Sequence, residues 1–308
     1  MRLFRNLDLP NEYKHTVIAI GNFDGVHLGH CSVIQKALDI GAKQKKKVGV
    51  LTFEPHPKCY FKNDFKFFRI TPFKQKMQIL KTMGLEFVIN LGFNSEFVKI
   101  TADCFLDDIL SNKLQVSKVV TGYDFVFGNK QKGDTNLIKK FVGLTKNFEF
   151  FEVTKFELNC QEISSSAIRN FLRTGELEKA NTYLSRDWLI ESRVVKGEQK
   201  ARAIGYRTAN FQIFKFCNLL YGVYKVSLKI DGFEKVFFGI ANYGVKPTFN
   251  KTEPILEVHI FDFEKDIYGK KVKIYFKYFL RNEKKFESVK KLRMQIKQDI
   301  KMIKNENG

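Results

Sequence analysis

The sequence predicts an α/β protein of two domains, in which a parallel-sheet domain is followed by an antiparallel β-barrel and a terminal helix. The chain has 308 residues, and about 150 residues per domain suggests two domains. Up to about residue 185, short β-branched runs alternate with helical patterns, which is typical of parallel βαβ units. Beyond about residue 188, apolar residues alternate with a period of two, which favours antiparallel strands closed into a barrel or sandwich.

In the first domain we expect five strands and five helices in alternation. The strands are expected at residues 16–21, 47–53, 86–91, 117–122 and 148–153. The helices are expected at residues 28–41, 72–83, 101–114, 135–146 and 164–174. Ligands of open α/β sheets bind beyond the carboxyl ends of the strands. The residues that follow each strand are therefore where we expect the chemistry.

In the second domain we expect five antiparallel strands and one helix. The strands are expected at residues 188–196, 221–230, 234–242, 255–263 and 271–280. A stripe at helical spacing predicts a terminal helix packed on the barrel: Phe286, Val289, Leu292, Ile296, Ile300 and Ile303. The change of period alone places the domains at residues 1–185 and 186–308.

Composition excludes several classes of protein. With 44% hydrophobic and 28% charged residues the chain is no disordered protein, and no window has the 18 or more apolar residues of a membrane span. The first residues are charged and lack the apolar region of a secretory signal. Five cysteines without a CxxC pair indicate neither a zinc site nor a disulfide framework. We therefore expect a cytoplasmic protein.

The net charge of +20 raises the alternative of a basic nucleic-acid-binding protein. From residue 265 onward there are 14 basic and 5 acidic residues, which fall mostly on the polar sides of an expected strand and helix. Such positions are typical of solvated faces. We therefore expect small-molecule partners and neither nucleic acid nor membrane; the sequence indicates no oligomeric state.

The segment VIAIGNFDGVHLGH, residues 17–30, predicts an anion site. A buried-type strand ends at Gly21, a turn contains Asp24 and Gly25, and a helix starts with His27 and His30. A helix N-terminus offers free N–H groups and a positive dipole end. The two histidines share a helix face, where they can offset the charge of a phosphoryl-transfer transition state. The absence of a GxxxxGK[ST] loop and of a GxGxxG fingerprint disfavours a P-loop kinase and a dehydrogenase.

An HxGH pattern after a first strand resembles the nucleotidyltransferase superfamily. GNFDGVHLGH is similar to the FMN adenylyltransferase module of bacterial bifunctional riboflavin kinase/FAD synthetases, as are TFEPHP (52–57), GYDFVFG (122–128) and ISSSAIR (163–169). The resemblance implies a Rossmann-like domain that binds ATP through Gly21, Phe23, Asp24, Gly25, His27, Gly29, His30, Ser164, Ser165 and Arg169, with His27 and His30 catalytic. It also implies a flavin site that includes Asp124, Phe125 and Phe127.

The stretch GEQKARAIGYRTANF, residues 197–211, resembles the riboflavin kinase signature. The resemblance implies that ATP and Mg²⁺ bind at Gly197, Gly205, Thr208 and Asn210, with Thr208 as the metal ligand, and that Glu257 is the catalytic base. The expected reactions are phosphorylation of riboflavin to FMN and adenylylation of FMN to FAD with release of pyrophosphate. ATP and the flavins are then substrates and Mg²⁺ is the cofactor.

The kinase half departs from the family pattern at four positions. Arg207 stands where the family has Pro, and Ala201, Ser185 and Ser192 replace glycines. If those glycines hold a positive φ, a side chain there costs about 1 kcal/mol. The alternative function is therefore an FMN adenylyltransferase with a degenerate kinase module.

Overall fold

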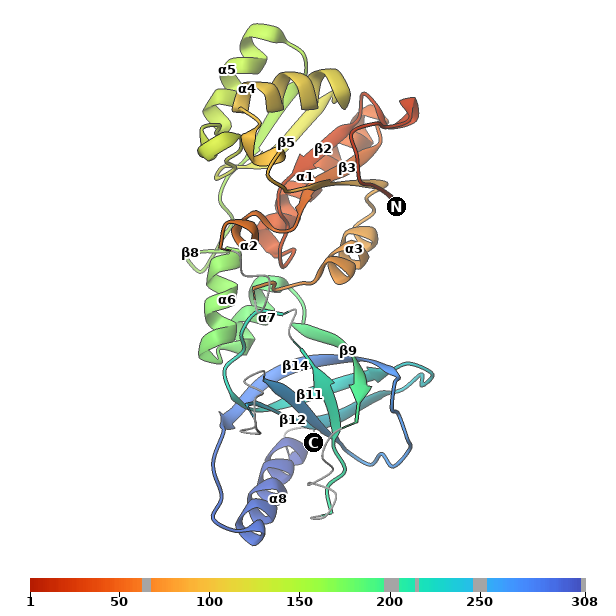
Figure 1. Ribbon diagram of the computed structural model, residues 1–308, viewed down its shortest axis with the longest axis vertical. Coiled ribbons are helices and arrows are strands. Elements are labelled where there is room, and N and C mark those ends of the chain that lie inside the picture. The colour runs from red at the N-terminus through yellow and green to blue at the C-terminus, as the bar shows by residue number, and fades with distance from the viewer. Residues whose placement is uncertain (63–67, 197–204, 214–215, 246–253, 306–308) are drawn as a thin grey trace. The chain divides into compact units, whose positions relative to one another are not determined.

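The computed structural model describes residues 1–62, 68–196, 205–213, 216–245 and 254–305, which form two compact units (Figure 1). The first unit is Met1–Ser165 and the second is Ser166–Gly308. The predicted functional boundary at residues 185/186 lies later in the chain and stays a prediction. It differs from the division into compact units because two helices precede the barrel in the second unit.

The first unit is built on a six-stranded parallel sheet in the order β1-β4-β3-β2-β5-β6. The strands are β1 (Arg2–Phe4), β2 (Val17–Ile20), β3 (Val48–Glu54), β4 (Phe87–Gly92), β5 (Lys118–Gly122) and β6 (Glu149–Val153). β2 pairs with β3, the next strand in the chain, on one side and with β5, a later strand, on the other side. The carboxyl end of β2 is therefore the switch point, where open α/β sheets bind ligands.

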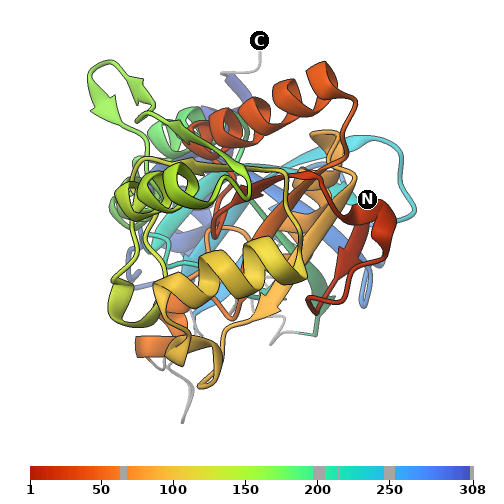
Figure 2. The same cartoon turned by 90° about the horizontal axis from the view of Figure 1, so that it is seen from above.

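Helices cover both faces of this sheet (Figure 2). One apolar core contains side chains of α1 and α3, and the other contains side chains of the π-helical segment η3 and of α5. The helices are α1 (Leu28–Gln44), α2 (Pro57–Lys62), α3 (Phe73–Thr82), α4 (Ala102–Cys104), η3 (Phe105–Lys113) and α5 (Thr135–Thr145), with 3-10 turns η1 (Asn11–Tyr13), η2 (Phe97–Lys99) and η4 (Asn129–Gln131). The hairpin β7 (Glu157–Leu158) and β8 (Gln161–Glu162) follows β6.

The second unit is a closed antiparallel barrel in the order β10-β13-β12-β11-β14-β9. Its strands are β9 (Leu189–Val195), β10 (Ala209–Gln212), β11 (Gly222–Ile230), β12 (Val236–Gly244), β13 (Ile255–Ile260) and β14 (Lys271–Asn282). Helices α6 (Ser165–Thr174) and α7 (Leu177–Leu184) precede it and α8 (Val289–Asn305) follows it. Asn181 of α7 donates from Nδ2 to Phe276 O of β14 at 3.0 Å, which fixes α7 against the barrel.

The predicted fold class is confirmed, and each predicted strand and helix has a counterpart within a few residues. The structure adds elements that the sequence did not predict. β1 and β10 have three and four residues, too short for an apolar period to be seen. The terminal stripe is correct only toward its C-terminal end, since Ile303 is buried in the barrel core whereas Val289 is 62% exposed.

Candidate active sites of the two units

The turn after β2 lies at the switch point of the sheet and leads into α1. Three of its residues have positive φ: Phe23 (51°), Gly25 (91°) and Val26 (43°). Non-glycine residues rarely adopt this conformation, which persists only where surrounding contacts enforce it. Phe23 and Val26 are almost fully buried, so tertiary packing fixes the path of the turn.

The structure brings His27 and His30 together at the start of α1. Their rings stack with centroids 3.6 Å apart and an interplanar angle of 21°. His27 is the N-cap of the helix, and its Nδ1 accepts a hydrogen bond from His30 N at 3.3 Å. Because Nδ1 accepts, the neutral His27 ring carries its proton on Nε2. His27 can therefore offer an N–H donor to a phosphoryl oxygen.

Gly29 allows a close approach at this helix start. A Cβ on Gly29 would lie 3.3 Å from the His27 ring and 3.3 Å from the carbonyl oxygen of Ile163. Any side chain would thus crowd both the stacked histidines and the segment before α6. Gly21 is similarly restricted, because a Cβ there would lie 3.1 Å from the Phe23 ring.

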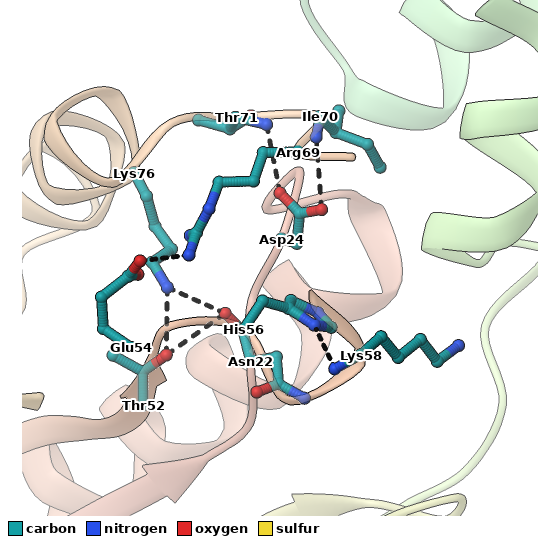
Figure 3. Close-up of polar contacts among 10 residues, drawn as sticks. All are labelled: Asn22, Asp24, Thr52, Glu54, His56, Lys58, Arg69, Ile70, Thr71 and Lys76. Atoms are coloured by element: carbon teal, nitrogen blue, oxygen red, sulfur yellow. Dashed lines mark hydrogen bonds and ion pairs between the residues drawn. The ribbon is translucent and has the colours of Figure 1, made fainter. Parts of the chain in front are cut away.

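Asp24 holds the turn from within. Its carboxylate is buried and accepts hydrogen bonds from Ile70 N at 3.2 Å and Thr71 N at 3.1 Å (Figure 3). Its carbonyl oxygen accepts a hydrogen bond from Ser165 Oγ at 2.8 Å. The structure therefore gives Asp24 a part in fixing the turn, beside the ATP contact that the sequence predicts for it.

The ISSSAIR segment meets the turn through this hydroxyl of Ser165. Ser164 directly precedes α6, Ser165 is the first residue of the helix, and Arg169 lies one turn later on the same helix face. Two segments far apart in the sequence, residues 21–30 and 164–165, are thereby joined. This is the juxtaposition that a shared phosphate site requires.

The expected flavin residues differ in their accessibility. Phe127 is buried and packs on Phe105 of the core with ring centroids 5.2 Å apart. Phe125 is half-buried and stacks on Phe127 at 5.4 Å, and Asp124 is exposed. Of these three residues, only Asp124 and Phe125 can contact a ligand directly. Phe127 packs behind Phe125 and supports its ring.

Tyr123, which the sequence did not single out, is tied to the hairpin that follows β6. Its hydroxyl donates to Glu162 Oε1 at 2.6 Å, and this bond raises the pKa of Tyr123 to about 12. The phenol therefore stays protonated near neutral pH. The bond fixes the turn that carries Asp124 and Phe125.

In the barrel, Glu257 lies in the middle of a polar row. It pairs in register with Asn210 of β10 on one side and with Asn242 of β12 on the other. Residues paired in register share a face of the sheet. Thr208 lies just before β10, two residues from Asn210. Asn242 was missed by the sequence analysis, although it lies within GIANYG, because only strand register reveals its place beside Glu257.

A hollow of about 240 Å³ lies beside Thr208. Its lining includes apolar side chains such as Val258, Phe263 and Tyr268. Arg207 donates from its guanidinium to Glu264 O at 3.0 Å, and both residues line the hollow. This hydrogen bond of Arg207 therefore links two segments that line the hollow.

The other positions at which the chain departs from the family pattern differ in their backbone conformation. Ser185 is in the left-handed region with φ 53°, as a replaced glycine would be, so the expected strain is present there. Ser192 lies inside β9, where extended backbone accepts any side chain, and donates to Gln212 O. Gly205 has φ 86°. Gly197 and Ala201 lie outside the described residues.

In the described parts of the chain, no three or more His, Cys, Asp or Glu side chains gather in a way that could hold a metal ion. Within the same ranges, every helix is too short or too polar to cross a membrane.

Comparison with known proteins shows the family to which the chain belongs. A family model described as FAD synthetase matches residues 9–167, and one described as riboflavin kinase matches residues 184–306. The chain belongs to the family of bifunctional riboflavin kinase/FMN adenylyltransferases. The presence of both domains supports the bifunctional reading over an adenylyltransferase with a degenerate kinase module.

Curated members of the family match nearly the full chain. The protein of Buchnera aphidicola subsp. Schizaphis graminum is 34% identical, covering 99% of this chain and 98% of its own. The protein of Escherichia coli K12 is 35% identical, covering 92% of this chain and 90% of its own. The protein of Bacillus subtilis 168 is 34% identical, covering 94% of this chain and 92% of its own. All three are named bifunctional riboflavin kinase/FMN adenylyltransferase.

A solved structure described as a macrolide-efflux protein from Streptococcus pneumoniae has the same fold. It superposes with a TM-score of 0.87 and 29% identity, covering 98% of each chain.

Proposed function

We propose that the first unit joins FMN to the adenylyl group of ATP and that the barrel phosphorylates riboflavin, with the residues named below. The observation that supports the first site best is the turn of residues 21–30 at the carboxyl end of β2, where two stacked histidines begin a helix. This is the place and the chemistry that a bound triphosphate requires.

In adenylyl transfer, an oxygen of the FMN phosphate attacks the α-phosphorus of ATP and pyrophosphate leaves. His27 and His30 donate to the phosphoryl oxygens, where negative charge increases in the transition state. Gly25, Gly29 and the start of α1 let the phosphates approach the backbone. Ser164, Ser165 and Arg169 supply hydroxyl and guanidinium donors, while Gly21, Phe23 and Asp24 shape the turn. The isoalloxazine binds at Asp124 and Phe125, with Phe127 behind them.

In the kinase reaction, the ribityl 5′-hydroxyl attacks the γ-phosphorus of ATP, and ADP leaves. Glu257 accepts the hydroxyl proton, while Asn210 and Asn242 on either side hold the row in place. ATP binds through Gly197, Gly205, Thr208 and Asn210, and its base fits the partly apolar hollow next to Thr208.

A Mg²⁺ ion fits the donor set of the barrel. Asn210 and Glu257 carry hard oxygen donors on two adjacent strands, and Thr208 adds a hydroxyl just before the first of them. Such donors together with phosphate oxygens are what Mg²⁺ prefers. Thr208 would be the direct ligand, with Asn210 near it. When bound, the ion would neutralise charge on the transferred phosphate.

We place the protein in the cytoplasm, with small molecules as its partners and no nucleic acid. None of the five cysteines, all of which are among the described residues, forms a disulfide, which fits a reducing compartment.

One experiment tests the proposed function. The purified protein is incubated with riboflavin, ATP and Mg²⁺, and the flavins are separated over time. The proposal expects FMN followed by FAD, and loss of FMN formation when Mg²⁺ is chelated. FAD formed only from supplied FMN would favour an inactive barrel, and no FAD from FMN would contradict the assignment of the first unit.

A further inference from the structure

Lys76 is a buried cation that no sequence motif explains. It lies on α3 with a side chain that is 2% exposed. Its ammonium group donates to Asn22 O at 3.0 Å and to Thr52 Oγ1 at 3.1 Å, and the Thr52 hydroxyl also donates to Asn22 O, at 3.2 Å (Figure 3). The three groups come from α3, from β3 and from the turn after β2, and they form a closed triangle.

The triangle lies where the sheet face changes from apolar to polar. Val48 and Val50 of β3 belong to the core that contains Leu80 of α3. Side chains alternate along a strand, so Thr52 and Glu54 continue the same face toward its carboxyl end. Glu54 forms an ion pair with Arg69, and one of its oxygens, Oε2, is buried without a hydrogen-bond partner among the described residues. A charged cluster that is buried at Lys76 and partly buried at Glu54 and Arg69 thus lies next to the turn.

Burying this ammonium is costly. Removal from water, followed in size by repulsion from Arg69, lowers the pKa of Lys76 to about 8, and the carboxylates of Glu54 and Asp24 only partly oppose this. An apolar side chain of similar length would fill the same space without that cost. Since burial disfavours the charged ammonium, its two hydrogen bonds call for an explanation other than stability.

The segment around Lys76 holds the phosphate turn on both sides of Phe23. Backbone N–H groups of Ile70 and Thr71 bind the Asp24 carboxylate, and Lys76 binds the carbonyl of Asn22. The strained residues of the turn begin between these anchors. Because their conformation depends on surrounding contacts, loss of one anchor should let the turn relax.

We propose that Lys76 is a positioning residue for adenylyl transfer, holding Asn22 O so that His27 and the start of α1 are in place before ATP binds. The proposal rests on the proposed function of the first unit. Lys76 acts through Asn22 and does not contact the substrate. Its loss should therefore lower kcat for FAD formation and leave the affinity for FMN nearly unchanged.

The test compares Lys76→Met, Lys76→Arg and Thr52→Val with the exposed-lysine control Lys81→Met on the same helix, all in the full chain. We expect Lys76→Met to lower kcat for FAD formation about 10²-fold, the scale for a small misplacement of catalytic groups. KM for FMN should change less than about threefold. Lys76→Arg should recover part of the rate, and Lys81→Met should match the wild type. Riboflavin phosphorylation by the same variants is measured to check that the barrel is intact.

A double-mutant cycle sharpens the test. Lys76→Met combined with Thr52→Val should be little worse than Lys76→Met alone, because both act on the one carbonyl of Asn22. Wild-type kcat in a folded Lys76→Met protein would overturn the proposal. If Lys76→Met does not fold, normal kcat in both Lys76→Arg and Thr52→Val would overturn it equally. No FAD formation by the wild type would instead contradict the proposed function itself.

Discussion

The candidate phosphate-handling residues of the first unit gather around one turn, whereas Asn210, Glu257 and Asn242 of the barrel stand on neighbouring strands. The turn of residues 21–26 contains three positive φ angles. It is fixed by buried hydrogen bonds with residues 70 and 71 and by partly buried ones with residues 52, 76 and 165. In the barrel, backbone ladders bring Asn210, Glu257 and Asn242 together.

This difference determines which substitutions each site can tolerate. A strand-built site keeps its geometry when one side chain is changed, because backbone hydrogen bonds hold the register. A turn-built site has no ladder, so distant anchors such as Lys76 and Asp24 become part of it. We therefore expect activity in the barrel to be lost mainly through its own reactive groups, and activity in the first unit to be lost through supporting residues as well.

The largest effect is expected at Glu257. Glu257→Gln should lower FMN formation by about 10² to 10⁴-fold, because it removes the general base with little change of shape. Steady-state assay of riboflavin phosphorylation measures this, and FAD formation from supplied FMN should be unchanged. The exposed Glu234→Gln is the matched control. A near-normal kinase rate in Glu257→Gln would make Glu257 an ordinary surface carboxylate.

The next largest effect is expected at the histidine pair. His27→Ala and His30→Ala should each lower FAD formation by roughly 10²-fold, the scale for losing one oriented donor. His27→Asn separates two roles, since Asn can retain the N-cap acceptor but not the imidazole N–H. This variant should recover the stability of the protein but not its rate of FAD formation. His15→Asn, at an exposed position, is the control. Equal loss of kinase activity would mean that the two sites are not separate.

A third effect tests the buried anchor through pH. The pKa of Lys76, about 8 when folded, is below the 10.5 of the free group, so between these values the folded chain has lost a proton that the unfolded chain keeps. The free energy of unfolding should therefore rise with pH across this window, by up to about 1.4 kcal/mol per pH unit. Denaturant unfolding of wild type and Lys76→Met at pH 7 to 10.5 measures the difference. A difference that does not vary with pH would show that Lys76 titrates normally.

A smaller effect is expected at Arg207. Arg207→Ala removes the hydrogen bond to Glu264 O and should raise the KM for ATP of the kinase by about two- to tenfold, as expected for one net hydrogen bond of ~0.5–1.5 kcal/mol. FAD synthesis should not change. If KM is unaffected and kcat falls steeply instead, Arg207 contacts the transferred phosphate, and the tie to residue 264 is incidental.

The smallest effect is expected at Ser185. Ser185→Gly should stabilise the barrel by at most about 1 kcal/mol, because Gly adopts the left-handed conformation without steric cost. Ser185→Ala loses the hydroxyl and keeps the strain, so it should not stabilise. Chemical denaturation of the three proteins gives the comparison. Equal stability of the Gly and Ala variants would show that strain at this position is negligible.

The sequence by itself determined the order of elements in both units and the motifs that they carry. The buried run before Gly21 and the alternation around residues 272–278 predict their strands because these patterns are local. The HxGH spacing likewise predicts that His27 and His30 share a helix face, since one turn of helix sets that geometry. The FMN adenylyltransferase and riboflavin kinase resemblance follows from such local strings.

Only the tertiary structure decided what supports each site. Lys76 reads as an ordinary helical lysine until β2 and β3 bring Asn22 and Thr52 beside it, from 54 and 24 residues away. Asn242 becomes a neighbour of Glu257 only through the register of β12 and β13. Short elements such as β10 and α7 take their place from barrel closure and from contacts such as that of Asn181 with Phe276. Local patterns do not carry this information, because burial and pairing depend on residues that are far apart in the chain.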